Sequence, residues 1–130
     1  MGAPTQQECI VRITRSADVP FESMEAENFA GDARRRDLGA TDAPDCRSLV
    51  VTFDPGARTH WHRHEKGQLI YGLSGSGEVG IRDGTTVTIG AGDLVHAPPG
   101  EEHWHGASAD GSLTHLALSF GATEWFEEVD

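Results

Sequence analysis

The sequence predicts one all-β domain, a sandwich or barrel of short antiparallel strands. Segments rich in Val, Ile, Leu and Thr follow one another at short spacing and are separated by turns of Gly, Pro and Asp. The apolar residues show almost no helical period, and no segment recurs at a period of roughly 20–50 residues. A chain of 130 residues fits a single domain and can bury about 65–70% of its unfolded surface.

The region before residue 48 is predicted to be mostly irregular. Residues 8–14 alternate moderately between polar and apolar side chains and are expected to form a short strand. Residues 17–45 are acidic and interrupted by Pro and Gly, with one helical turn expected over 24–29. The arginines at 34–36 are expected to form a solvated face that pairs with neighbouring acids.

The strands of the predicted barrel begin at residue 48. The Asp-Pro-Gly run at 54–56 ends the first strand, and Asp83-Gly84 is typical of a hairpin turn. The Ser-Gly-Ser-Gly run at 74–77 is expected to end one strand before the next begins. Strands are predicted at 48–53, 68–73, 78–82, 85–89, 94–97, 103–107 and 113–120. The sequence after residue 121 is predicted to form a short helix docked by its aromatic side chains.

We therefore divide the chain into an N-terminal arm and irregular segment (1–47), a barrel (48–121) and a C-terminal tail (122–130). An open sheet edge in such a barrel needs covering. Residues 8–15 are expected to cover it by pairing with a second subunit, so the sequence predicts a homodimer.

The composition limits the partners of the chain. Ten Lys and Arg against 21 Asp and Glu give a formal charge of -11, which opposes binding to nucleic acid or to an anionic membrane. There is no run of about 18 apolar residues and no signal-peptide pattern, so we expect a cytoplasmic protein with no membrane partner. Cys9 and Cys46 are far apart and are expected to be reduced thiols.

The histidines carry the chemistry of this sequence, and all seven lie between His60 and His115. His62 and His64 alternate, and Gln68 follows four residues later. Because a strand sends every second side chain to the same face, the two imidazoles share one side. His103 lies in a second alternating group, directly after a Pro-Pro-Gly turn.

These two groups predict a metal site inside the barrel, with His62, His64, Gln68 and His103 as ligands. Imidazole nitrogens and an amide oxygen suit Mn, Fe, Co, Ni, Cu or Zn, and the residues alone do not rank these metals. Gln68 either ligates the metal or makes only hydrogen bonds. An uncharged ligand set leaves the charge of the cation uncompensated, which makes a strong Lewis acid that favours an anionic oxygen.

The two groups resemble the two motifs of the cupin superfamily. The first motif is matched in spacing by Gly56, His62, His64, Gln68 and Gly75, with Gln in place of the family's Glu. The second is matched by Gly92, Pro98, Gly100 and His103, with Ala107 in place of the family's Asn. The resemblance implies a jelly-roll β-barrel, the double-stranded β-helix.

With Gln68 in the position of the family's Glu, the sequence is similar to a subgroup of small single-domain cupins related to carboxymuconolactone decarboxylase-associated proteins. This subgroup includes bacterial cupin hydroxynitrile lyases. The resemblance implies a manganese site held by His62, His64, Gln68 and His103. In those lyases a histidine in a Thr-His-Leu-Ala context acts as the base, and His115 has that context here.

The pattern around His115 agrees with a role in the pocket, since Leu113, His115, Ala117 and Ser119 share one face of the last strand. An unligated imidazole has an ordinary pKa of about 6.5, which suits proton transfer at neutral pH. The alternative is a core histidine bound to a backbone carbonyl. His105 shares the face of His103 and is expected to orient substrate, assist His115 or be structural.

The remaining candidates are less specific. His60 is expected to narrow the pocket, to lie at its rim or to join the metal, and Thr59 and Tyr71 are further pocket candidates. His96 precedes two prolines and is expected to be structural. The two tryptophans beside the ligand histidines, Trp61 and Trp104, are expected to pack outside the barrel.

Three functions remain open on the sequence. The first is a metal-dependent lyase or isomerase acting on a small oxygenated organic molecule, of which cyanohydrin cleavage is the sharpest form. The second is an iron-dependent dioxygenase, and the third is a cupin that binds a metal and a small molecule without turnover.

Overall fold

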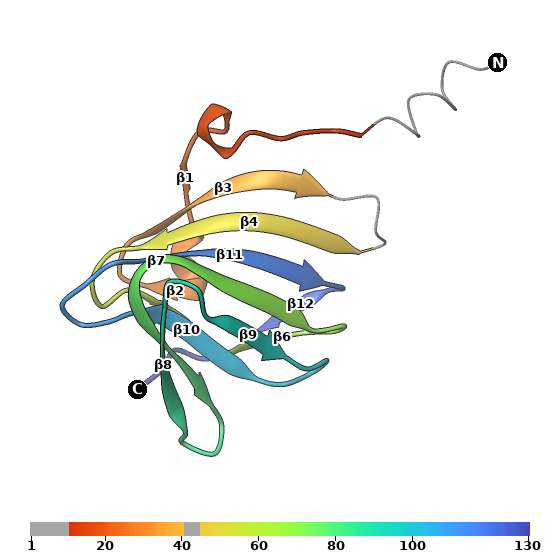
Figure 1. Ribbon diagram of the computed structural model, residues 1–130. Helices are drawn as coiled ribbons and strands as arrows, with labels where there is room; N and C mark the ends of the chain where they lie inside the picture. The colour runs from red at the N-terminus through yellow and green to blue at the C-terminus, as the bar shows by residue number, and fades with distance from the viewer. Residues whose placement is uncertain (1–10, 41–44) are drawn as a thin grey trace.

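The computed structural model describes residues 11–40 and 45–130, and its main feature is a curled antiparallel β-sheet that closes part-way into a barrel (Figure 1). The strands are β1 (Glu22–Ser23), β2 (Phe29–Ala30), β3 (Ala33–Ala40), β4 (Cys46–Phe53), β5 (Arg58–Thr59), β6 (His62–His64), β7 (Gln68–Ile81), β8 (Thr86–Gly90), β9 (Leu94–Ala97), β10 (His103–Ala107), β11 (Leu113–Phe120) and β12 (Thr123–Trp125). Two 3₁₀ turns, Ser16–Asp18 and Ala26–Asn28, precede β2. No helix of the described residues is long and apolar enough to cross a bilayer.

The strands pair in the order β1-β3-β4-β11-β7-β10-β5-β2, with β8 and β9 added to β7 and with β6 joining β10 to β12. One wall of the barrel therefore contains β3, β4, β11, β7 and β9. The opposite wall contains β8, β10, β5, β6 and β12, together with the second half of β7. The predicted all-β class is confirmed, and β9, β10 and β11 have the predicted bounds.

β7 is a single strand of 14 residues, so the predicted break at 74–77 is wrong. Its first half pairs with β9 and β11, and its second half pairs with β8 and β10. Gly75 lies at the change of partners with φ of +83°, where a Cβ atom would come 2.0 Å from the carbonyl oxygen of Ser112. The glycine at position 75 therefore lets the strand bend from one wall to the other, and the run at 74–77 does not end it.

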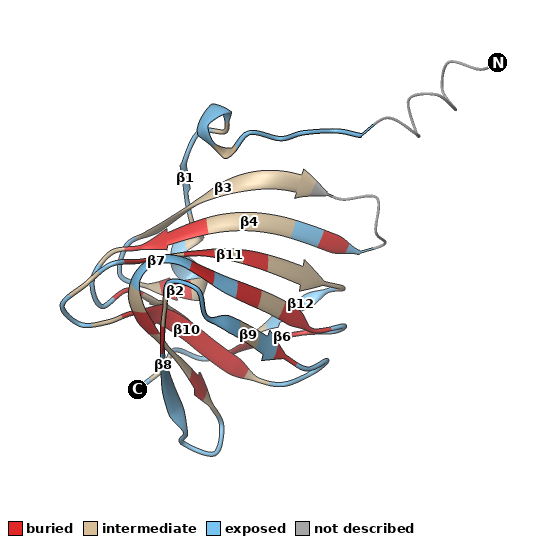
Figure 2. Cartoon of the chain, viewed as in Figure 1, coloured by how far each residue is buried: buried red, intermediate tan, exposed pale blue. Residues whose placement is uncertain are grey.

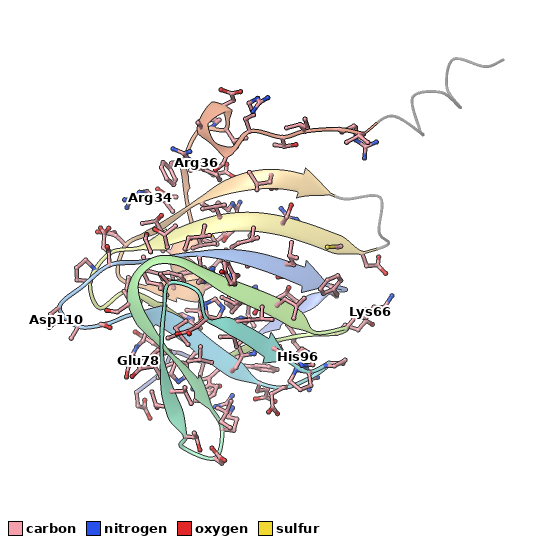
Figure 3. All side chains as sticks on the ribbon, viewed as in Figure 1. Arg34, Arg36, Lys66, Glu78, His96 and Asp110 are labelled. Atoms are coloured by element: carbon pink, nitrogen blue, oxygen red, sulfur yellow. The ribbon has the colours of Figure 1, made fainter. Side chains whose placement is uncertain are left out.

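The prediction of irregular structure before residue 48 is wrong for 33–40, which form β3 at one side of the sheet beside β4. Arg34 and Arg36 project from the outer side of this strand (Figure 3). The predicted pairing with acids is confirmed, because Arg34 contacts Asp54 at 3.1 Å and Arg35 contacts Glu22 and Glu25 at 2.9 Å each. The charged sequence of this segment does not predict a strand, and the strand forms because it pairs with β4.

The two ends of the chain also differ from expectation. Residues 11–14 form no strand, and residues 8–10 lie outside the described part of the chain. The predicted turn over 24–29 is confirmed as the 3₁₀ turn Ala26–Asn28. The predicted C-terminal helix is wrong: residues 123–125 form β12, which pairs with β6 and packs Trp125 against Phe29. Cys46 is a buried free thiol, and Cys9 is outside the described residues.

One end of the barrel is filled by a solid core, and Figure 2 shows buried residues on the facing strands β4, β10 and β11. The core is formed by Phe29, Val51, Phe53, Ala57, Ile89, Ala107 and Leu113. Phe53 and Leu113 have no exposed surface. Burial of two such side chains stabilises the fold by about 1.5–3 kcal/mol each. The imidazoles begin directly beyond this core, so the core is the floor of the site.

Candidate metal centre and cavity

Three histidines from two paired strands converge inside the barrel. His62 and His64 alternate on β6 and are both buried, whereas Arg63 between them is half-buried. β10 runs antiparallel to β6 with His103 directly opposite His62. One ring nitrogen from each of these imidazoles lies within 4.8 Å of the others, a grouping that could hold a metal ion. The predicted convergence of these side chains is therefore present.

The other ring nitrogen of each imidazole is held by the chain. Nδ1 of His62 donates to the carbonyl oxygen of His60 at 3.0 Å, and Nδ1 of His103 donates to that of Glu101 at 3.0 Å. Nδ1 of His64 lies 2.9 Å from Oγ1 of Thr123. Because a carbonyl oxygen only accepts, Nε2 of neutral His62 and His103 carries a lone pair. Nε2 of His64 is buried and has no hydrogen-bond partner among the described residues.

Gln68 completes this cluster from the start of β7. Its Oε1 lies 2.9 Å from Nε2 of His103, and its Nε2 donates to Oγ of Ser119 at 2.9 Å. The amide therefore points its oxygen toward the imidazoles and its nitrogen toward β11. The set of donors is three imidazole nitrogens and one amide oxygen, and all four side chains are buried.

The imidazoles are neutral in this environment. Burial lowers the pKa of His64 to about 4, helped by the neighbouring charge of His103. Burial also lowers the pKa of His103, and it lowers that of His62 well below its ordinary value, with His103 adding to the effect. A metal needs unprotonated nitrogen, so these shifts keep the three ligands ready at neutral pH.

A second pair of histidines lies beside the first cluster. Nε2 of His115, on β11, lies 3.1 Å from Nδ1 of His105, on β10. The remaining ring nitrogens, Nε2 of His105 and Nδ1 of His115, are buried and have no hydrogen-bond partner among the described residues. Burial lowers the pKa of His115 to about 4 and lowers that of His105 well below its ordinary value, with the charge of His115 as the next cause for His105. Phe53 contacts both rings from the core side.

His62 and His64 of the first cluster line one cavity of about 150 Å³ together with His105 and His115. Its apolar walls include Leu49, Val51, Phe53 and Ala117. An engineered protein cavity of about this volume holds benzene, so the space suits a small molecule. Two arginines also line it, and each is held by acids: Arg35 by Glu22 and Glu25, and Arg47 by Asp37 at 2.6 Å. Each guanidinium is therefore already paired with at least one carboxylate.

The comparison with known families decides the assignment of this fold. The family described as the cupin domain matches residues 49–118, which include both histidine groups. The chain belongs to the cupin family. It is similar to an (R)-mandelonitrile lyase from Granulicella tundricola, with 45% identity over 109 residues that cover 80% of this cupin and 83% of that protein.

Solved structures agree with the assignment. A cupin-like protein from Thermotoga maritima has a TM-score of 0.79 at 32% identity, covering 83% of this cupin and 86% of that chain. The polyketide cyclase RemF from Streptomyces resistomycificus has a TM-score of 0.72 at 22% identity, covering 93% of this cupin and 87% of that chain. At that identity the second likeness shows the fold alone.

The other pocket candidates lie in different places. Thr59 lines the cavity and its hydroxyl accepts the backbone N–H of His105 at 3.2 Å. His60 is half-buried and does not line the cavity; its carbonyl holds His62. Tyr71 is 44% exposed because it follows Ile70 on β7, where Ile70 faces inward, so the expectation that Tyr71 reaches the pocket is wrong. His96 is exposed on β9 (Figure 3).

The tryptophans stand outside the cavity, as predicted. Arg82 stacks on Trp61 at 4.1 Å, and Arg58 stacks on Trp104 at 5.3 Å. Their sequence neighbours on the inner face are the ligand candidates, which is the alternation expected of β6 and β10.

Several cavity residues have no role in the sequence-based prediction. Ser119 was placed on the face of His115, which is the signal that could have identified it. Thr123 and Trp125 line the cavity from β12. They share one face because they are two residues apart on a strand, and the predicted helix would not have placed them together. Arg35 and Leu49 line it from β3 and β4, and only the pairing of those strands brings them there.

Proposed function

We propose that this cupin is a metal-dependent lyase that cleaves small cyanohydrins into an aldehyde and hydrogen cyanide. One observation carries the proposal: His62 and His64 of the three-histidine cluster line the same small cavity as the His105–His115 pair. The similarity at 45% identity to a protein named (R)-mandelonitrile lyase supports this reaction class.

The donor set fits a divalent transition metal, and we propose manganese as the ion that it holds. The fit rests on the neutral imidazoles and on the unpartnered Nε2 of His64. His62, His64, His103 and Gln68 would hold the ion through three nitrogens and one amide oxygen. A cation bound there would supply a Lewis acid that stabilises negative charge on a substrate oxygen, without a carboxylate ligand to offset it.

His115 is the proposed base. It is fully buried and lines the cavity. Burial lowers its pKa to about 4, below the expected 6.5, so the ring is unprotonated at pH 7, the form that a base needs, although it is a weaker base than a free imidazole. In cyanohydrin cleavage the hydroxyl proton leaves as the C=O bond forms and the bond to the nitrile carbon breaks. His115 takes that proton and returns it to the departing cyanide, so the reaction balances without a further reactant.

His105 is proposed to support this proton transfer. Its Nδ1 lies within hydrogen-bond distance of Nε2 of His115, and its backbone N–H is held by Thr59. The pair therefore keeps the His115 ring in one orientation, with its free Nδ1 buried at the cavity wall. The apolar walls exclude water from the carbon skeleton of a substrate.

The test is the cleavage of mandelonitrile. Protein purified without added metal is analysed for metal content, stripped with a chelator, reloaded with manganese(II) and assayed for benzaldehyde and cyanide release. Activity should require the metal and should be lost in His115→Ala. Loaded protein that leaves mandelonitrile and smaller aliphatic cyanohydrins intact contradicts the proposal. Oxygen uptake with an iron-loaded sample would then favour a dioxygenase, and neither activity would favour a binding protein.

We also propose a cytoplasmic homodimer. The described part of the N-terminal arm extends away from the barrel (Figure 1), and Val11 and Ile13 expose 87% and 73% of their surface. Apolar side chains at that exposure are suited to cover a second subunit. Residues 11–15 form no strand pairing within the described chain, so an edge of the partner subunit would have to supply it.

A further inference from the structure

We propose that Ser119 is a positioning residue that holds the Gln68 amide with its oxygen toward the metal site. This inference rests on the proposed metal site and adds a residue to it. Ser119 makes one hydrogen bond with Gln68, accepting from its Nε2 at 2.9 Å, while Oε1 of the same amide faces His103 at 2.9 Å. The hydroxyl and the imidazole thus contact opposite ends of one amide.

The sheet places Ser119 for this contact. β11 and β7 are neighbours, and Ser119 lies directly opposite Gln68 in their register. Residues opposite each other on neighbouring strands point to the same face, about 4.5–5.5 Å apart at Cβ. The serine is also the next inward residue after His115 and Ala117 on β11, and it lines the cavity. From this position its hydroxyl reaches the Gln68 amide.

The orientation of the amide creates a conflict that a cation removes. Nδ1 of His103 donates to the carbonyl of Glu101, so this tautomer presents the lone pair of Nε2 toward the amide. That lone pair lies 2.9 Å from another acceptor, the amide oxygen of Gln68. Two acceptors at this distance repel, and a positive ion beside both is the simplest partner for them.

Ser119 anchors the end of the amide that faces away from the imidazoles. In the ligating orientation its Oγ accepts from Nε2 of Gln68 at 2.9 Å, while Oε1 stays beside His103. Without the hydroxyl that end of the amide has no anchor on β11, so the Gln68 side chain is free to turn away from His103 before any metal binds.

The test is metal affinity in the absence of substrate. Apo protein is titrated with manganese(II), followed by calorimetry and by the electron paramagnetic resonance spectrum of the bound ion. Ser119→Ala should weaken binding about 10–100-fold, the usual effect of removing a residue that orients a ligand. Ser119→Thr, which keeps the hydroxyl, should restore most of the affinity. Ser76→Ala removes a serine hydroxyl that bonds Ser108 away from the cavity, and it should leave binding unchanged.

A double-mutant cycle separates positioning from a general structural effect. In a Gln68→Ala background the serine has no amide to orient, so Ser119→Ala should cause no further loss. An equal loss in both backgrounds, or wild-type affinity and an unchanged spectrum in Ser119→Ala, overturns the inference. If the wild-type chain binds no metal, the metal site and this inference both fail. If it binds metal and shows the predicted cycle but leaves cyanohydrins intact, only the lyase proposal fails.

Discussion

His115 on β11 and His105 on β10 lie with their ring nitrogens 3.1 Å apart, although the strands belong to opposite walls of the barrel. The contact is possible because β7 bends from one wall to the other and pairs with both strands. Each ring then has one nitrogen in the pair and one buried nitrogen without a partner among the described residues. A pair with unused, buried polar atoms is costly to stability, which favours a functional reason for it.

The first prediction concerns His115. His115→Ala should lower kcat for cyanohydrin cleavage by about 100-fold or more, because a positioned base contributes about 10²–10⁴-fold. Manganese affinity should stay within a few-fold of wild type, since His115 is outside the three-histidine cluster. Steady-state kinetics and metal titration on the same preparation measure both. An equal loss of metal affinity and activity would assign His115 to metal binding instead.

The second prediction concerns His105. His105→Phe keeps the size of a ring beside Phe53 but removes the partner of His115. We expect a reduced kcat with little change in metal affinity. The pH dependence of kcat should also shift, because the His115 ring would lose its polar neighbour and its pKa would change. A pH profile identical to wild type would leave His105 with a packing role alone.

The third prediction concerns Gln68. Gln68→Glu adds a negative ligand, which should tighten divalent metal binding and weaken the Lewis acid, lowering kcat by roughly tenfold or more. Metal titration and kinetics together test the two opposite effects. Equal affinity in the Gln68→Glu and wild-type proteins would contradict ligation by this side chain.

The fourth prediction is an acid-sensitive apo protein. The pKa of His115 is near 6.5 in the unfolded chain and about 4 in the folded one. The unfolded state therefore binds more protons between these values, so stability is complete above pH 6.5 and falls as the pH drops toward 4. The loss from this residue is on the order of 3 kcal/mol. His64 adds a loss of the same sign.

Urea unfolding of the metal-free protein at several pH values measures this loss. The variant His115→Gln should reduce the dependence on pH, because one of the titrating groups is gone. A slope in His115→Gln equal to that of wild type would show that His115 is protonated in neither state or in both.

The fifth prediction concerns assembly. Light scattering after size-exclusion chromatography should give twice the 14.0 kDa mass of one chain. Changing Val11 and Ile13 together to Ser should shift the protein toward one chain if the arm covers a second subunit. A wild-type mass of one chain would rule out the dimer at the concentration measured.

The sequence by itself determined the fold class and which histidines point into the barrel. Alternation on a strand places every second residue on one face whatever surrounds it, so the spacing of His62 and His64 was enough to place both imidazoles on the inner side. The same rule placed His115, Ala117 and Ser119 together on β11. Glycine and proline turns were enough to predict β9, β10 and β11 with their correct bounds.

Only the tertiary structure decided which distant residues meet these side chains. Gln68 and Ser119 are 51 positions apart, and β-strand register alone brings them together. β3 forms a strand because it pairs with the edge of β4, although its local composition favoured irregular structure. β12 forms a strand because it pairs with β6, although its local composition favoured a helix. Strand pairing is a long-range interaction, and its energy overrides the weak local preferences from which sequence patterns are read.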